Sequence, residues 1–515
     1  MTSRNSITLL ALVAFLGFFL NIWGIPLFDL DEGAFTQATR EMFLRGDFIS
    51  PYVNGMPRYD KPVLIHWLQA ASVALFGVNE FALRLPSALA ATGWMFVVYF
   101  FVRQVRDERS AFIAAFMVAT ALQVGIIGKA AIADAVLNLF MVIALFAIFL
   151  HERAPARRWV LLAFAAMGLG FLTKGPVAVL VPFAVSLLYY GVRGQWRLWL
   201  GAVTLPAGIA LFLLISLPWY VLQYLREGQA FIDGFFLTHN VDRFGGPMEG
   251  HGGSLFYYVP VAFVAVMPFA AVLARAVRDM PQTLRDPLGQ FLWLWFGFVL
   301  VFFSLSGTKL PHYLNYGLTA ALILMALVIG RMSSRGWALL PVVLLVAVLL
   351  PLPQWITLAL PGIEAPEVHA MLSDGLAQFD WHWYAAMGAA LLVLLVLMFW
   401  PKLSVTTALL GSGVVLSLLV SLCVLPTVGA VQQGPVREAA RLARELPGPY
   451  VMWRINTPSY SVYSGHIMQM REPQPGDLVL TRSIHKEALG PYTALYESGG
   501  VMLARRRPAP PGLHD

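Results

Sequence analysis

Three carboxylates follow directly after the first hydrophobic segment of the chain, on Asp29, Asp31 and Glu32. A carboxylate at a bilayer boundary carries a desolvation cost unless it is paired, solvated in a cavity or used in a reaction. Only 12% of the residues are charged, so an acidic edge of this kind stands out. Its position predicts a reaction site at one membrane face.

A second charged group lies further along the same connection, at Arg58, Asp60 and Lys61. Lys61 precedes a proline, which favours an extended backbone at that position. Lysine is a compact cation suited to phosphate, although an interfacial lysine that reaches toward water would have the same sequence signature. Both interpretations of Lys61 stay open at this point.

Asp134 is embedded in the apolar run 130–137, near one end of a hydrophobic segment. A carboxylate in that setting must face a polar cavity or a cation, so we expect a functional role for Asp134.

Cations occur in the turns that contain Lys174 and Lys309, and the 223–255 connection adds His239 and Arg243 among glycines. Each lysine is also typical of a helix end, and a flexible polar loop would resemble the 223–255 connection. Taken together, carboxylates and cations on one face predict a substrate that carries phosphate.

The composition places the chain among polytopic membrane proteins. Of its 515 residues, 58% are hydrophobic, and the mean hydropathy is +0.70. The net charge of +7 does not indicate nucleic-acid binding, because lysine and arginine concentrate in the cytoplasmic loops of membrane proteins. The single cysteine, Cys423, excludes an internal disulfide and a cysteine metal site.

About thirteen segments are long and apolar enough to cross a bilayer as helices. We place them at residues 6–23, 81–102, 110–127, 131–150, 158–173, 176–191, 198–222, 256–274, 288–305, 312–330, 336–357, 383–400 and 404–425. We interpret the first of them as an uncleaved span, because no small-residue cleavage site follows it.

Alternate connections between these segments are rich in arginine, and the positive-inside rule makes them cytoplasmic. The other connections face outward, into the periplasm of a bacterium, and they carry all the candidate site residues. We expect a transmembrane domain over 1–426, whose outer loops are 24–80 and 223–255. A small α/β periplasmic domain with a disordered tail is expected over 427–515.

Within the first outer loop, Asp31 is placed to cap a helix that ends at Gly46 and lies in the membrane interface. In the tail, helical spacing over 435–446 and apolar runs at 450–453, 478–480 and 501–503 predict one helix and three strands.

Several short motifs, taken in order, resemble those of the GT-C lipid-linked sugar transferases, in particular the aminoarabinose transferases of lipid A, with protein O-mannosyltransferases as more distant kin. The resemblance covers about residues 20–320. Its motifs are Asp31-Glu32-Gly33, Thr39-Arg40-Glu41-Met42, Gly46-Asp47-Phe48, Asp60-Lys61-Pro62 with Trp67, Thr173-Lys174-Gly175, Arg243-Phe244, Tyr257-Tyr258-Val259-Pro260 and Lys309-Leu310-Pro311 with Tyr313.

The resemblance implies roles for these residues. Asp31 corresponds to an essential aspartate, with Glu32 as its support in the catalytic group, and Asp134 corresponds to a second functional carboxylate. The lipid phosphate would be held by a set of cations and one tyrosine, namely Lys61, Arg58, Arg243, Lys309 and Tyr313. Asp60 and His239 match a divalent metal site of the family, and two ligands alone do not establish an ion.

The predicted reaction is inverting transfer of a sugar from undecaprenyl monophosphate to an acceptor at the outer leaflet. The acceptor is lipid A or another envelope glycolipid or polysaccharide, and protein O-glycosylation is the alternative within the superfamily. A lipid or sugar transporter is the rival from another class, but transporters place their charges near the bilayer midplane. We expect the protein to be a monomer that binds no nucleic acid. Apart from the possible divalent metal ion, the sequence indicates no cofactor.

Overall fold

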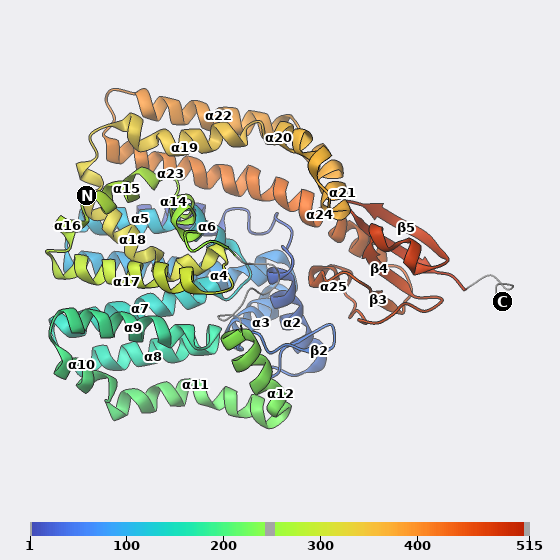
Figure 1. The fold of residues 1–515 in the computed structure, drawn as a ribbon, viewed down its shortest axis with the longest axis horizontal. Coiled ribbons are helices and arrows are strands. Elements are labelled where there is room, and N and C mark those ends of the chain that lie inside the picture. Colours follow the sequence, from blue (N-terminus) through green and yellow to red (C-terminus); the bar gives the residue numbers. More distant parts are fainter. Residues whose placement is uncertain (1–2, 243–252, 509–515) are drawn as a thin grey trace.

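A computed structural model describes residues 3–242 and 253–508, and it consists of a bundle of long helices with a small sheet domain at one end (Figure 1). The long helices of the bundle run roughly parallel to one another and away from the sheet domain, and shorter helices lie between and beyond them. They are α1 (Ser3–Ala14), α4 (Glu80–Val105), α5 (Glu108–Thr120), α6 (Leu122–Lys129), α7 (Asp134–Arg153), α8 (Arg157–Lys174), α9 (Val177–Val192), α10 (Trp196–Val203), α11 (Pro206–Glu227), α14 (Tyr258–Ala265), α15 (Ala270–Arg278), α16 (Met280–Thr283), α17 (Pro287–Leu305), α18 (Asn315–Val328), α19 (Arg335–Leu349), α20 (Leu352–Ala359), α22 (Trp381–Phe399), α23 (Val405–Leu419) and α24 (Leu425–Ala443).

Among the described residues, seven helices are long and apolar enough to cross a membrane, and the number rises to nine if each of two bent pairs is one span. The bent pairs are α5 with α6, at 61°, and α19 with the helical stretch that begins at α20, at 55°. The predicted segment 198–222 is divided between α10 and α11, and 256–274 is divided between α14 and α15. Hydrophobic runs therefore located the helical segments but not the breaks within them.

The first connection forms two helices, α2 (Asp31–Arg45) and α3 (Leu64–Phe76), between the bundle and the sheet domain (Figure 1). Two acidic residues in the first turn of α2 and Arg45 in its last turn complement the helix dipole. Gly46 ends the helix with φ +65°, a conformation that glycine adopts without strain.

The burial of α2 differs from that of a helix lying in the membrane interface. Phe35, Ala38 and Met42 of the predicted apolar stripe are buried, but so are Thr39 and Glu41 on other faces. Helix α2 contacts both α3 and the sheet domain, so it is enclosed by protein on several sides.

A hairpin of β1 (Tyr52–Val53) and β2 (Met56–Pro57) joins α2 to α3. Its turn residues Asn54 and Gly55 both have positive φ, as a two-residue hairpin turn requires. The buried Glu41 carboxylate accepts from the Gly55 backbone N–H at 3.1 Å, and Glu227 at the end of α11 accepts from Tyr52 Oη at 2.8 Å. The hairpin is therefore fixed to helices on two sides.

The sheet domain contains β3 (Tyr450–Met452), β4 (Leu478–Arg482), β5 (Tyr492–Ser498) and β6 (Val501–Arg506), in the order β3-β4-β6-β5. Strands β3 and β4 are parallel, and the other pairs are antiparallel. The three predicted strands are present. Strand β5 was missed because its residues are mostly polar or half-exposed, and the sequence there lacks an apolar run.

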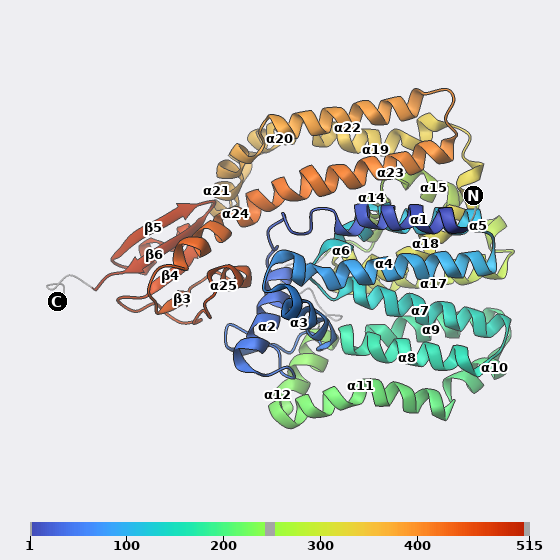
Figure 2. The same cartoon turned by 180° about the vertical axis from the view of Figure 1, so that it is seen from behind.

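Two more helices connect this domain to the bundle. Helix α24 runs without interruption from the bundle into the sheet domain, so the predicted boundary at 427 falls inside one helix (Figure 2). Helix α25 (Pro458–Ser464) follows β3 and packs against both α2 and α24. Helices α12 (Gln229–Ile232) and α21 (Pro366–Gly375) lie at the same end of the bundle.

Candidate functional site

A cavity of about 760 Å³ opens at the end of the bundle that carries α2 and the sheet domain. It collects side chains from distant parts of the chain. The polar residues that line it are Asp31, Arg58, Tyr59, Asp60, Lys61, Asp134, Lys174, Ser306, His312, Tyr313, Tyr316 and Asn456. Six of the ten predicted site residues lie in this set.

Asp31 is the first residue of α2, and its exposed side chain lines the cavity. The predicted cap at Asp31 is wrong: the helix is preceded by Leu30, and no side chain caps it. Asp31 is thus left to face the cavity, as a group that acts on a substrate must.

Glu32 does not line the cavity. It is 4% exposed and forms a two-point ion pair with the buried Arg84, at 2.8 Å from Nε and 2.6 Å from Nη2. Its carboxylate also accepts from the backbone N–H groups of Phe28, at 2.9 Å, and Ala131, at 2.7 Å. These contacts tie the start of α2 to α4 and to the segment before α7, so Glu32 positions its neighbour Asp31.

The basic group of the hairpin also faces the cavity. The Arg58 guanidinium donates to Asp60 through Nη2 at 2.9 Å and lies 4.4 Å from the centre of the Phe35 ring. Its Nη1 is buried without a hydrogen-bond partner among the described residues. Lys61 Nζ lies 3.5 Å from the Asp60 carboxylate and donates to the Asp60 carbonyl at 3.0 Å. Two cations therefore contact one carboxylate on this wall.

Asp134 is buried at the first turn of α7, where the helix dipole favours a negative charge. Lys174 Nζ, from the end of α8, donates to both Asp134 oxygens at 2.8 Å. Tyr316 Oη donates to the same carboxylate at 3.3 Å. Lys174 also lies 5.9 Å from the centre of the Tyr313 ring. The expectation that Asp134 faces a cation in a polar cavity is met, and the cation is Lys174.

Lys309 was predicted to bind phosphate, but its side chain does not line the cavity. It is 7% exposed, and its Nζ donates to the Ser306 carbonyl at 2.7 Å, which is the contact of a lysine that ends a helix. Tyr313, four residues further on, does line the cavity.

The metal prediction rests on residues that the structure describes only in part. Asp60 is engaged by Arg58 and Lys61, while Arg243 and the side chain of His239 lie outside the described residues. Within 3–242 and 253–508, no three His, Cys, Asp or Glu side chains come together as metal ligands. The metal site stays a prediction.

The sheet domain contributes part of the cavity wall, which sequence reasoning missed. Asn456 and Pro458, between β3 and the first turn of α25, line the cavity together with Asp31. Asn456 is exposed there. No motif marked it, because more than 400 residues of chain separate it from Asp31 and only the packing of α25 on α2 joins them.

Asp29 holds this wall in place. Its carboxylate accepts from the Ser459 backbone N–H at 3.0 Å and from the Ser459 hydroxyl. Burial raises the pKa of Asp29 to about 7, although both hydrogen bonds from Ser459 act to lower it. Gly33 permits the approach, since a Cβ there would lie 1.9 Å from Asp29 Oδ1.

Comparison with known proteins gives one family match and several relatives. The family described as dolichyl-phosphate-mannose-protein mannosyltransferase matches residues 60–221. An uncharacterized protein from Aquifex aeolicus is 32% identical over 62% of this chain and 71% of its own length. An undecaprenyl phosphate-alpha-4-amino-4-deoxy-L-arabinose arabinosyl transferase from Pseudomonas paraeruginosa is 34% identical over 61% of this chain. The match spans 57% of that enzyme.

The fold is that of a solved structure. ArnT from Cupriavidus metallidurans, bound to undecaprenyl phosphate, superposes with a TM-score of 0.81 over 98% of both chains at 22% identity. The helical bundle, the first-loop helices and the cavity between them thus form the fold of that structure, with seven to nine helices among the described residues that can cross a membrane. By sequence, the chain belongs to the same family as the Aquifex aeolicus protein, and it is similar to undecaprenyl phosphate-dependent arabinosyl transferases.

Proposed function

We propose that the chain is an inverting glycosyltransferase that moves a sugar from a polyprenyl monophosphate, such as undecaprenyl phosphate, to an acceptor at the periplasmic face of the inner membrane. One observation carries the proposal: a single cavity collects Asp31, the Asp134–Lys174 pair and the basic pair Arg58 and Lys61. Carboxylates and cations together suit a reaction in which a phosphate leaves from a sugar.

The basic wall is the proposed site of the donor phosphate. When the bond between the anomeric carbon and the phosphate oxygen breaks, negative charge grows on that oxygen, and nearby fixed cations stabilise it. Arg58 is available for this, since its Nη1 has no partner among the described residues, and Lys61 lies on the same wall of the cavity. We propose that Arg243 joins them from the 223–255 connection.

Asp31 is the proposed base. The acceptor oxygen attacks the anomeric carbon from the face opposite the phosphate, which inverts the configuration, and Asp31 takes the proton of an attacking hydroxyl. If the acceptor is an ionised phosphate, no proton is transferred and Asp31 orients the acceptor. Asp134 and Lys174 fix the floor of the cavity by joining the ends of α7 and α8.

The acceptor proposed first is lipid A or another envelope glycolipid, on the strength of the arabinosyl transferase relatives. A protein acceptor is the second candidate, because the family match at 60–221 is to protein mannosyltransferases. We propose that the chain acts as a monomer.

The test uses the purified full-length chain with undecaprenyl phosphate that carries a radiolabelled sugar. Transfer to lipid A, to a polysaccharide or to a peptide identifies the acceptor, and repetition in EDTA tests the metal. Asp31→Asn should abolish transfer without loss of folded protein. Movement of the intact donor across vesicles without any sugar transfer would contradict the proposal and favour a transporter.

A further inference from the structure

A second cavity, of about 550 Å³, lies beside the first one and shares no lining residue with it. Its lining comes from the start of α4, from the end of α24 and from α25, together with Pro26 and Leu27. Leu27 lines this cavity, and Leu30 and Asp31, three and four residues further on, line the first one. Nothing in the proposed glycosyl transfer uses the second cavity.

One wall of this cavity is basic. Arg437, Arg441 and Arg444 project from one side of α24, at the spacing of successive helical turns. Arg437 lies 3.5 Å from Glu80, and Arg441 lies 3.2 Å from Glu438. Arg444 donates from Nε to the Tyr463 carbonyl at 3.1 Å, and no carboxylate among the described residues pairs with it.

These arginines have room to bind a ligand. The side chains of Arg437 and Arg441 are 49% and 75% exposed, and their ion pairs are long or local to one helix. Surface pairs of this kind are weak, so an incoming anion competes for the guanidinium groups at little cost. Three cations against two carboxylates leave the wall positive.

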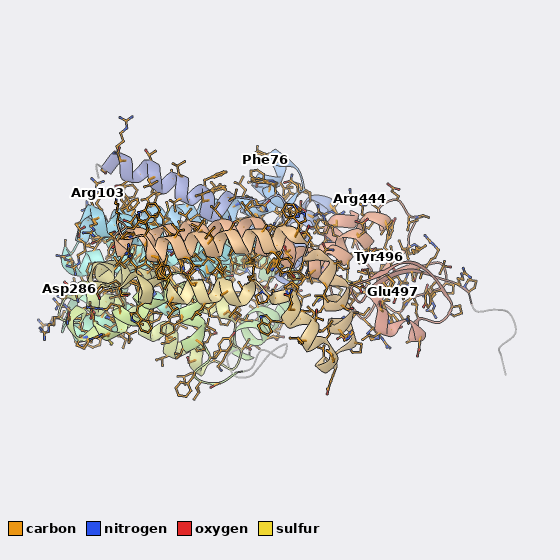
Figure 3. The ribbon with its side chains drawn as sticks, turned by 90° about the horizontal axis from the view of Figure 1, so that it is seen from above. Phe76, Arg103, Asp286, Arg444, Tyr496 and Glu497 are labelled. Carbon is orange, nitrogen blue, oxygen red and sulfur yellow. The ribbon has the colours of Figure 1, made fainter. Side chains whose placement is uncertain are left out.

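At Val78 the cavity lining adjoins an exposed apolar segment at the end of α3. Val78 lines the cavity at 47% exposure, and Leu75 and Phe76 at the end of α3 are 78% and 51% exposed. In Figure 3, Phe76 lies along the bundle between Arg103, at the far end of α4, and Arg444. The apolar segment thus lies on the bundle side of the arginines. A lipid would be ordered in the same way, with its acyl chains toward the bundle and its headgroup toward the arginines.

We propose that this cavity binds an anionic phospholipid, with its phosphate against Arg441 and Arg444 and its acyl chains against Leu75, Phe76 and Val78. Guanidinium groups bind phosphate through paired, charge-assisted hydrogen bonds, and a juxtamembrane basic cluster attracts anionic lipid. The lipid would join α4 to α24 and brace the 26–31 segment that carries Asp31. This inference goes beyond the proposed function and does not depend on it.

The test measures lipid binding to the full-length protein by native mass spectrometry and by thermal unfolding in detergent. Phosphatidylglycerol should bind and raise the unfolding midpoint, whereas phosphatidylcholine and inorganic phosphate should do so at least about tenfold more weakly. Equal stabilisation by phosphatidylcholine would refute recognition of the negative charge. Equal stabilisation by inorganic phosphate alone would refute the lipid and indicate a soluble anion.

Two variants locate the site. The double substitution R441Q/R444Q should weaken phosphatidylglycerol binding by about tenfold, while the matched control R505Q/R507Q, on the sheet domain, should leave it unchanged. Gly434→Phe adds a ring to the cavity lining and keeps every arginine, and the position has room for a side chain because a Cβ at Gly434 meets no atom within 4 Å. It should also abolish binding. Wild-type binding in the folded Gly434→Phe variant would overturn the proposal.

Discussion

The substitution Glu32→Gln tests whether Glu32 positions the site or reacts in it. Arg84 is 2% exposed and directs its guanidinium at both Glu32 oxygens and at the carbonyls of Ile22, Ile25 and Pro26. Glutamine keeps one acceptor and turns an NH2 group toward the donors of Arg84 or toward the backbone N–H of Ala131. Removing one partner of a buried pair costs about 3–5 kcal/mol, because the other charge stays buried without compensation.

We therefore expect Glu32→Gln to lower the unfolding midpoint by on the order of 5 °C. The measurement is thermal unfolding of the purified protein in detergent, followed by sugar transfer per folded molecule at low temperature. Transfer by the folded fraction should persist. Asp31→Asn is the matched control next to it: its side chain is exposed, so the midpoint should stay and transfer should be lost. A Glu32→Gln protein with the wild-type midpoint and no transfer would refute the positioning role.

Three further predictions follow from the same site. Asp134→Asn and Lys174→Met should each reduce transfer at least about 100-fold and lower the free energy of unfolding. The double variant should lose less stability than the sum of the two single losses, which unfolding of all three variants would show. Strict additivity would contradict the ion pair. The pKa of Asp29 is raised to about 7 from 3.8, so the folded state holds its proton more tightly and this group's contribution to stability falls as the pH rises toward 7. The free energy of unfolding should change by about 2–3 kcal/mol more between pH 5 and pH 8 in the wild type than in Asp29→Asn. Equal changes would exclude Asp29 as the group responsible. Asn456→Ala should raise the KM for the acceptor about tenfold and leave donor binding unchanged, and an unchanged KM would remove Asn456 from the acceptor site.

Much of the fold followed from local patterns. Runs of apolar residues predict helices because an unpaired backbone cannot remain in lipid, and the predicted segments fall on helices. The stop at Gly46 is confirmed, since the residue adopts the positive φ expected there. Breaks inside α10–α11 and α14–α15 were missed, because hydropathy averages over a window that a short turn does not interrupt.

The site was predicted in part. Asp31 and Asp134 were identified because charge is costly beside a membrane, whereas Lys61 was assigned by the motif resemblance; all three line the cavity. Lys174 was interpreted as a helix end more readily than as a functional cation, since its sequence environment is a Gly-Pro turn and nothing local marks Asp134 as its partner. Glu32 and Lys309 carry the right charge, but their side chains point to Arg84 and to a carbonyl instead.

By itself the sequence determined the membrane class, the helical segments and the face on which charge gathers, because these depend on the composition of contiguous residues. The tertiary structure alone decided which charges meet: it paired Asp134 with Lys174, buried Glu32 against Arg84 and brought Asn456 of the sheet domain beside Asp31. Those contacts join segments up to several hundred residues apart. They arise from how helices pack, and no local pattern records that packing.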